Sequence, residues 1–93
     1  MTRVRVVFSS ALTGVTIGEK EAEVSASSLR EALDKLAEKY GDGFKERILD
    51  ATGKPKRLLN FYVNGKNVRL LKQVDTPLDD GDEVTVLPAV SGG

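Results

Sequence analysis

The chain has 93 residues, 40% of them hydrophobic and 30% charged, which is enough apolar material for one domain with a single core. Its 14 basic and 14 acidic residues give a formal net charge of zero, which argues against a nucleic-acid-binding protein. Cysteine and histidine are both absent, which excludes a disulfide framework, a thiolate nucleophile and the commonest general base. No apolar run is long enough to span a membrane, and the start lacks a signal-peptide cleavage site, so we expect a cytoplasmic protein that binds no membrane.

The first third of the chain predicts a β-hairpin. Apolar and polar residues alternate through Arg3–Phe8, which is the period of a strand. The segment Ser9–Gly14 is rich in turn residues, and Glu19–Val24 reads as a second, more polar strand. The two strands are expected to pair through a connection longer than a tight two-residue turn.

A helix is predicted next, because the apolar residues from Leu29 to Tyr40 fall on one stripe at helical spacing. Ser28 and Glu31 form a capping-box signature in front of this stripe, and Gly41 stands where a helix commonly ends. Glu31 and Lys35 are spaced to form a favourable ion pair along the helix. This is the strongest local pattern in the chain.

The second half predicts short elements joined by turns. Asn64-Gly65 is a hairpin-turn signal between two of them. In chain order, we expect a short helical piece from Phe44 that ends near Gly53, a basic loop Lys54–Arg57, a strand Leu58–Val63, a short strand Asn67–Leu70, a turn Pro77–Gly81 and a final strand Glu83–Leu87.

This order of elements predicts the α+β class, as a β-grasp (ubiquitin-like) roll in which a mixed sheet has one main helix packed on one face. The first and last strands are the most apolar, which favours central positions in the sheet. Residues 1–88 would form the domain and residues 89–93 a flexible Gly-Gly tail. The helix residues Leu29, Leu33 and Leu36 are expected to pack on Val4, Val6, Phe61, Val63, Val84 and Val86.

The sequence contains no convincing catalytic or metal-binding constellation. Asp79, Asp80 and Asp82 surround a glycine as in a calcium loop, but the spacing places Thr76 and Leu78 at ligand positions, so an acidic turn is the simpler interpretation. The basic loop Lys54–Arg57 could meet an acidic partner or a phosphate, but a solvated loop is the favoured interpretation.

A docking surface is expected on the sheet face away from the helix. Strand alternation places there a mixture of apolar and polar side chains, namely Arg5, Val7, Tyr62, Thr85 and Leu87. Pro88 cannot continue a hydrogen-bonded ladder, so the last strand should end near it. Five extended residues beyond Pro88 would span roughly 16–18 Å, which is enough to enter a partner's active site.

The chain end, VTVLPAVSGG, resembles the C-termini of the ubiquitin-like sulfur carriers MoaD, CysO and, more distantly, ThiS. The family's GDEV turn stands at Gly81–Val84 and its PxVxGG ending at Pro88–Gly93. The stretch NFYVNGKNVR, Asn60–Arg69, is also similar to the equivalent strand and turn of MoaD and CysO.

This resemblance implies a carrier rather than an enzyme, either alone or as the small subunit of a molybdopterin synthase. An E1-like enzyme would use ATP to adenylate Gly93, next to Gly92, and a sulfur donor would convert it to a thiocarboxylate. The sulfur would then pass, through a synthase large subunit or a sulfur-acceptor enzyme, into molybdopterin or cysteine biosynthesis. The residues expected to contact these partners are Arg5, Val7, Tyr62, Leu87, Pro88 and Val90.

Two other functions remain open at this point. A ubiquitin-like modifier would use the same activation and join Gly93 to lysines of other proteins. A plain interaction domain would leave the tail unused. A sulfur-bearing C-terminus would indicate the carrier, lysine-branched peptides would indicate the modifier, and neither product would indicate the interaction domain.

Overall fold

The computed structural model describes residues 2–57 and 59–88. The expectations for Leu58, Val90, Gly92 and Gly93 therefore lie outside the described residues. A five-stranded mixed sheet with the strand order β2-β1-β5-β3-β4 forms one layer. Its strands are β1 (Arg3–Phe8), β2 (Glu21–Ser25), β3 (Leu59–Val63), β4 (Lys66–Asn67) and β5 (Glu83–Pro88).

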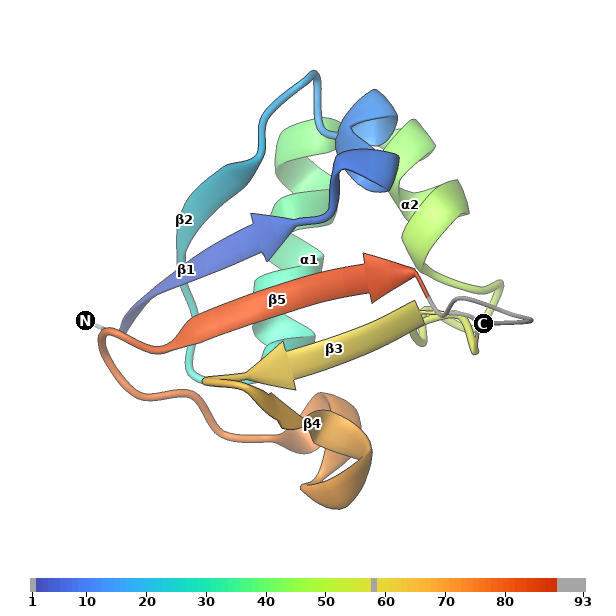
Figure 1. The fold of residues 1–93 in the computed structure, drawn as a ribbon. Coiled ribbons are helices and arrows are strands. Elements are labelled where there is room, and N and C mark those ends of the chain that lie inside the picture. Colours follow the sequence, from blue (N-terminus) through green and yellow to red (C-terminus); the bar gives the residue numbers. More distant parts are fainter. Residues whose placement is uncertain (1, 58, 89–93) are drawn as a thin grey trace.

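The first and last strands lie side by side in the middle of the sheet, as their apolar composition predicted. β1 and β5 run parallel, whereas β1–β2, β3–β5 and β3–β4 are antiparallel. The helix α1 (Leu29–Tyr40) covers one face, and Figure 1 views the sheet from the opposite side. A mixed sheet with this order and one main helix on one face is the β-grasp roll, so the predicted fold class is confirmed.

The ends of α1 form as the local sequence predicted. Ser28 Oγ accepts a hydrogen bond from the Glu31 backbone N–H at 3.1 Å, and Glu31 Oε1 accepts one from the Ser27 N–H at 2.7 Å. Gly41 ends the helix at φ 85°, a conformation that costs a residue with a side chain more than it costs glycine. Lys35 donates to the Ser25 carbonyl oxygen and forms no close salt bridge with Glu31 in the described residues. The hydrogen bond from the Ser27 backbone contributes most to lowering the pKa of Glu31, and the charge of Lys35 is among the further causes that lower it.

The core lies between α1 and the sheet, as predicted. The apolar residues of α1 and of the three central strands belong to one cluster of buried side chains. Leu29 and Leu36 are fully buried and Leu33 is 3% exposed. Their strand partners, all at most 7% exposed, are Val4, Val6, Phe61, Val63, Val84 and Val86.

Several predicted boundaries shift for local reasons. The expected strand Asn67–Leu70 is reduced to β4, because the Asn67 side chain accepts a hydrogen bond from the Arg69 N–H at 2.9 Å and starts a 3-10 helix, Val68–Leu70. The turn-rich segment after β1 is a 3-10 helix, Ser10–Val15, and β2 begins two residues later than expected. Helix α2 (Asp42–Ile48) ends well before Gly53.

Candidate functional site

The sheet face opposite α1 carries a row of side chains that crosses three strands. Val7 of β1 pairs in register with Thr85 of β5, and Thr85 pairs with Tyr62 of β3. Neighbouring strands lie about 4.7–4.9 Å apart, so these three residues are direct neighbours across the sheet. Each is half-buried, whereas the flanking residues along each strand point into the core.

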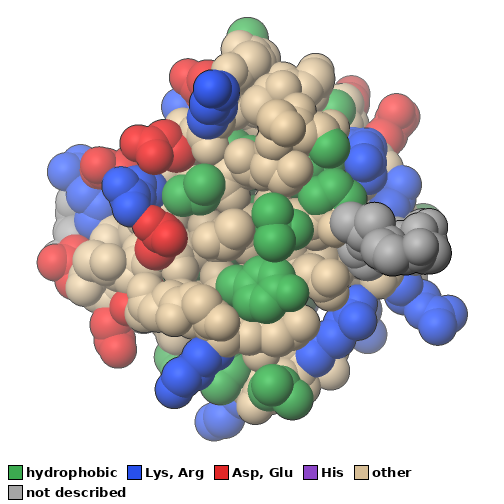
Figure 2. All heavy atoms as spheres, viewed as in Figure 1, with side chains coloured by type: hydrophobic (Ala, Val, Ile, Leu, Met, Phe, Trp, Pro, Cys, Tyr) green, Lys and Arg blue, Asp and Glu red, His purple; other side chains and the backbone are tan. Residues whose placement is uncertain are grey.

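The row continues toward the end of β5. Leu87 is 38% exposed and pairs in register with Asn60, and Pro88, the last residue of β5, pairs with Leu59. Figure 2 views the molecule from this side and shows hydrophobic side chains near the middle of the face, with charged side chains around them. We call Val7, Tyr62, Thr85 and Leu87 the open-face patch.

An ion pair borders the open-face patch where β5 begins. The Arg5 guanidinium of β1 binds the carboxylate of Glu83, which lies opposite it in β5. This hydrogen bond, and then the charges of Glu83 and Glu21, raise the pKa of Arg5 above its ordinary value. Arg5 is therefore a fixed cation at the edge of the patch rather than part of its apolar centre.

The structure brings together most of the predicted partner-binding residues. Arg5, Val7, Tyr62, Thr85 and Leu87 lie on one face, and β5 ends at Pro88 as expected. Their part in binding a partner stays a prediction. Within residues 2–57 and 59–88, no group of three or more acidic side chains is arranged to hold a metal ion, and no helix has the length and apolar character needed to cross a membrane.

The sequence analysis did not predict that Arg69 would lie near the basic loop. Arg69 lies beside the basic loop, because its Nη2 donates a hydrogen bond to the Arg57 carbonyl oxygen at 2.8 Å. Twelve residues separate the two in sequence, and β3 lies between them, so no local pattern could have indicated the contact.

Comparison with known proteins identifies the family. Residues 7–93 match the ThiS family, which is nearly the whole chain. The chain belongs to the ThiS family. This ThiS-family chain is 38% identical over 92 residues to the sulfur carrier protein CysO of Mycobacterium tuberculosis strain H37Rv, a match that covers 97% of the chain and 98% of the relative.

Solved structures agree with this assignment. The ThiS-family chain superposes on the crystal structure of the Amycolatopsis orientalis BexX/CysO complex with a TM-score of 0.86 and 34% identity, over 97% of the chain and 99% of the matched chain. It also superposes on the solution structure of the small archaeal modifier protein 1 of Methanosarcina acetivorans, with a TM-score of 0.84 and 31% identity over 100% and 98% of the two chains. The CysO relatives support a sulfur carrier role, that of a small carrier rather than an enzyme.

Proposed function

We propose that this protein carries sulfur as a thiocarboxylate on Gly93. The observation that carries the proposal is the 38% identity to the sulfur carrier CysO, which extends over 97% of the chain and 98% of the relative. The match to the ThiS family over residues 7–93 includes the VTVLPAVSGG end on which the proposed chemistry depends.

The proposed chemistry begins with activation of a poor electrophile. The Gly93 carboxylate oxygen attacks the α-phosphorus of ATP, pyrophosphate leaves, and an acyl-adenylate forms on the E1-like partner. A sulfide-level sulfur donor then attacks the carbonyl carbon, AMP leaves with the bonding electrons, and the thiocarboxylate remains. Glycine at the last two positions lets the chain pass through a narrow channel, because it has no side chain to collide with the walls.

The folded domain contributes binding energy rather than a reacting group. Thr85 and Leu87 of the open-face patch lie on β5, the strand that leads to Gly93, and Tyr62 lies beside them on β3. A partner docked on Leu87 and Tyr62 would therefore hold the carboxylate beside ATP. Half-buried tyrosine is a common anchor in protein interfaces. The acceptor of the sulfur would lie in molybdopterin or cysteine biosynthesis, the pathways that the sequence resemblance implies.

A second candidate is a protein modifier. The likeness to the small archaeal modifier protein 1, at 31% identity over the whole chain, favours it. Both functions share the adenylation step, and they differ in the nucleophile, which is sulfur in one and a lysine amine in the other.

Reconstitution separates the two functions. The protein is incubated with the E1-like enzyme of its own genome, ATP and sodium sulfide, and in parallel with a cell extract that supplies acceptor proteins. We expect the product with sulfide to react with iodoacetamide at Gly93. Because Lys72 is the last basic residue, trypsin would leave the Gln73–Gly93 peptide on a modified lysine, and we expect the digests of the extract to contain no lysines branched in this way. Branched lysines without an alkylated C-terminus would favour the modifier, and neither product would refute both.

A further inference from the structure

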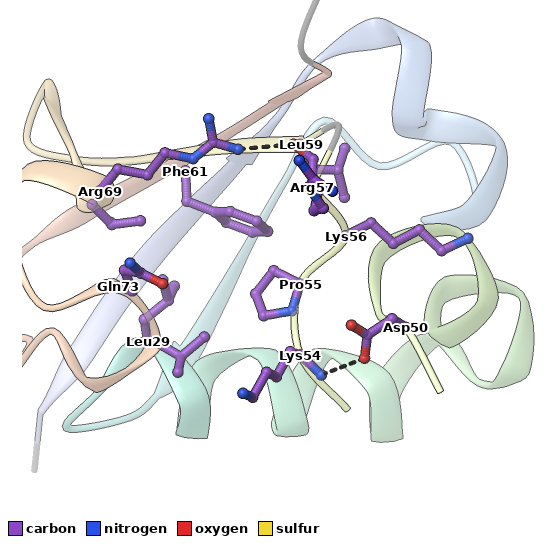
Figure 3. A pocket seen from close by; sticks show the side chains of 12 residues that line it. Leu29, Asp50, Lys54, Pro55, Lys56, Arg57, Leu59, Phe61, Arg69 and Gln73 are labelled. Atoms are coloured by element: carbon purple, nitrogen blue, oxygen red, sulfur yellow. Dashed lines mark hydrogen bonds between the residues drawn. The ribbon is translucent and has the colours of Figure 1, made fainter. Parts of the chain in front are cut away.

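A groove lies beside the end of the sheet, on the side of β3 that faces the core. Its volume is about 700 Å³, and buried Leu29, Leu59 and Phe61 line its floor. Pro55 from the basic loop and Val74 from the segment after β4, both half-buried, form its walls. Figure 3 shows these elements facing one another across the groove.

Four cations surround this groove. Lys54, Lys56 and Arg57 of the basic loop and Arg69 are all exposed and all line it. The described part of the chain forms four ion pairs, and none of them involves these side chains. Because the whole chain has no formal net charge, these four cations give the groove region a local excess of positive charge.

The one carboxylate in the groove lining, that of Asp50, accepts hydrogen bonds from residues of the adjoining loop. Asp50 Oδ1 accepts hydrogen bonds from the Thr52 hydroxyl at 2.6 Å and from the Lys54 N–H at 3.1 Å, and the first of these contributes most to lowering the pKa of Asp50. The Lys56 N–H donates to the Ile48 carbonyl oxygen at 2.9 Å. The backbone of the loop is thus held in place, while its cationic side chains remain at the rim.

We propose that this groove binds an acidic segment of a partner protein, with an apolar side chain of that segment inserted between Pro55 and Val74. An apolar floor inside a charged, exposed rim is the usual anatomy of a protein interface. Small-molecule sites instead carry polar groups inside the cavity, and the buried polar side chains of the described chain, Thr16 and Thr76, do not line this groove.

The groove and the open-face patch can be occupied together. Successive residues of β3 point to opposite sides, so Leu59 and Phe61 face the groove while Tyr62 lies on the open face. Leu59 pairs with Pro88, which places the groove next to the end of β5. A partner that reaches this end of the sheet can therefore bind the groove by a separate segment. The inference does not depend on sulfur transfer, because it concerns the folded domain alone.

The test uses a fluorescein-labelled synthetic peptide in which glutamates flank a central Leu-Phe pair. Two further peptides replace the glutamates by glutamine or the Leu-Phe pair by serine. Binding is measured by fluorescence anisotropy at low salt and located by amide chemical-shift changes. The variant K56E/R57E is compared with K20E/K66E, which changes the net charge equally at exposed lysines that do not line the groove.

We expect shifts at groove residues and affinity about tenfold weaker in K56E/R57E, since each lost or reversed surface charge contact contributes modestly. K20E/K66E should bind as wild type, K56Q/R57Q should lie between, and both substituted peptides should bind more weakly. Equal losses in the two double variants, shifts outside the groove, or no binding would overturn the proposal. The proposal would also be overturned if inorganic phosphate or single-stranded DNA bound the same residues as tightly as the peptide does, because that would indicate a general anion site.

Discussion

Truncating Leu33 to alanine removes three carbon atoms from the centre of the helix–sheet interface. Only 3% of this residue is exposed, so the lost atoms are almost entirely buried ones. At about 0.8 kcal/mol per buried carbon group, the transfer loss alone is roughly 2.4 kcal/mol, and the remaining cavity raises the expected cost to about 3–5 kcal/mol. Alanine favours helices at least as strongly as leucine, so weakened helix propensity does not contribute.

Urea denaturation measures this cost directly. With an m-value of about 1–3 kcal/mol/M for a small domain, the midpoint should fall by about 1–5 M at an unchanged slope. Leu70→Ala is the matched control, because the same atoms are removed from a side chain that is 84% exposed, and its midpoint should hardly move. An unchanged midpoint for Leu33→Ala, or an equal loss in both variants, would refute the packing of α1 described here.

Three further predictions concern docking, the tail and pH. The double variant Tyr62→Ala, Leu87→Ala should keep its fold but be activated more slowly by the E1-like enzyme in a pyrophosphate-exchange assay. The control Leu70→Ala should be activated at the wild-type rate. Equal rates for the double variant and wild type would eliminate the open-face patch as a docking surface. Gly92→Val should leave the thermal midpoint unchanged and abolish activation, and normal exchange would contradict the narrow-channel argument. Glu31→Gln should lower the melting temperature at pH 7, because its carboxylate accepts a backbone N–H bond that lowers its pKa. Because the pKa of Glu31 is lower in the folded than in the unfolded protein, its ionised carboxylate stabilises the fold at pH values above the unfolded pKa of 4.5. The difference in melting temperature between wild type and Glu31→Gln should therefore vanish as the pH falls below 4.5. A difference that stays constant with pH would argue against that bond.

Local sequence patterns accounted for much of the fold. The Ser28 cap and the Gly41 terminus form from residues a few positions apart, so the limits of α1 could be predicted from sequence alone. Alternation in β1 and β5 separated their core residues from the open-face patch, because side chains on a strand have a period of two.

The features that were missed depend on competing or distant contacts. The residues around Asn67 predict a strand, but the Asn67 side chain accepts a hydrogen bond from the Arg69 N–H. The backbone after Asn67 therefore forms a 3-10 helix. Lys35 is correctly spaced for Glu31, yet it reaches the Ser25 carbonyl oxygen, which only the packed hairpin provides. Likewise, the groove is lined by residues from Leu29 to Val74, which only the folded chain brings together.

The most direct test of sulfur transfer is the intact mass of the protein after incubation with its E1-like enzyme, ATP and sulfide. Wild type should gain the mass of one oxygen-to-sulfur exchange, mapped by fragmentation to Gly93. A variant that lacks Gly93 places its carboxylate one residue short of the reacting position, so it should keep its folded-state spectrum and gain no sulfur. If that variant acquired sulfur as readily as wild type, Gly93 would not be the carrier of the sulfur.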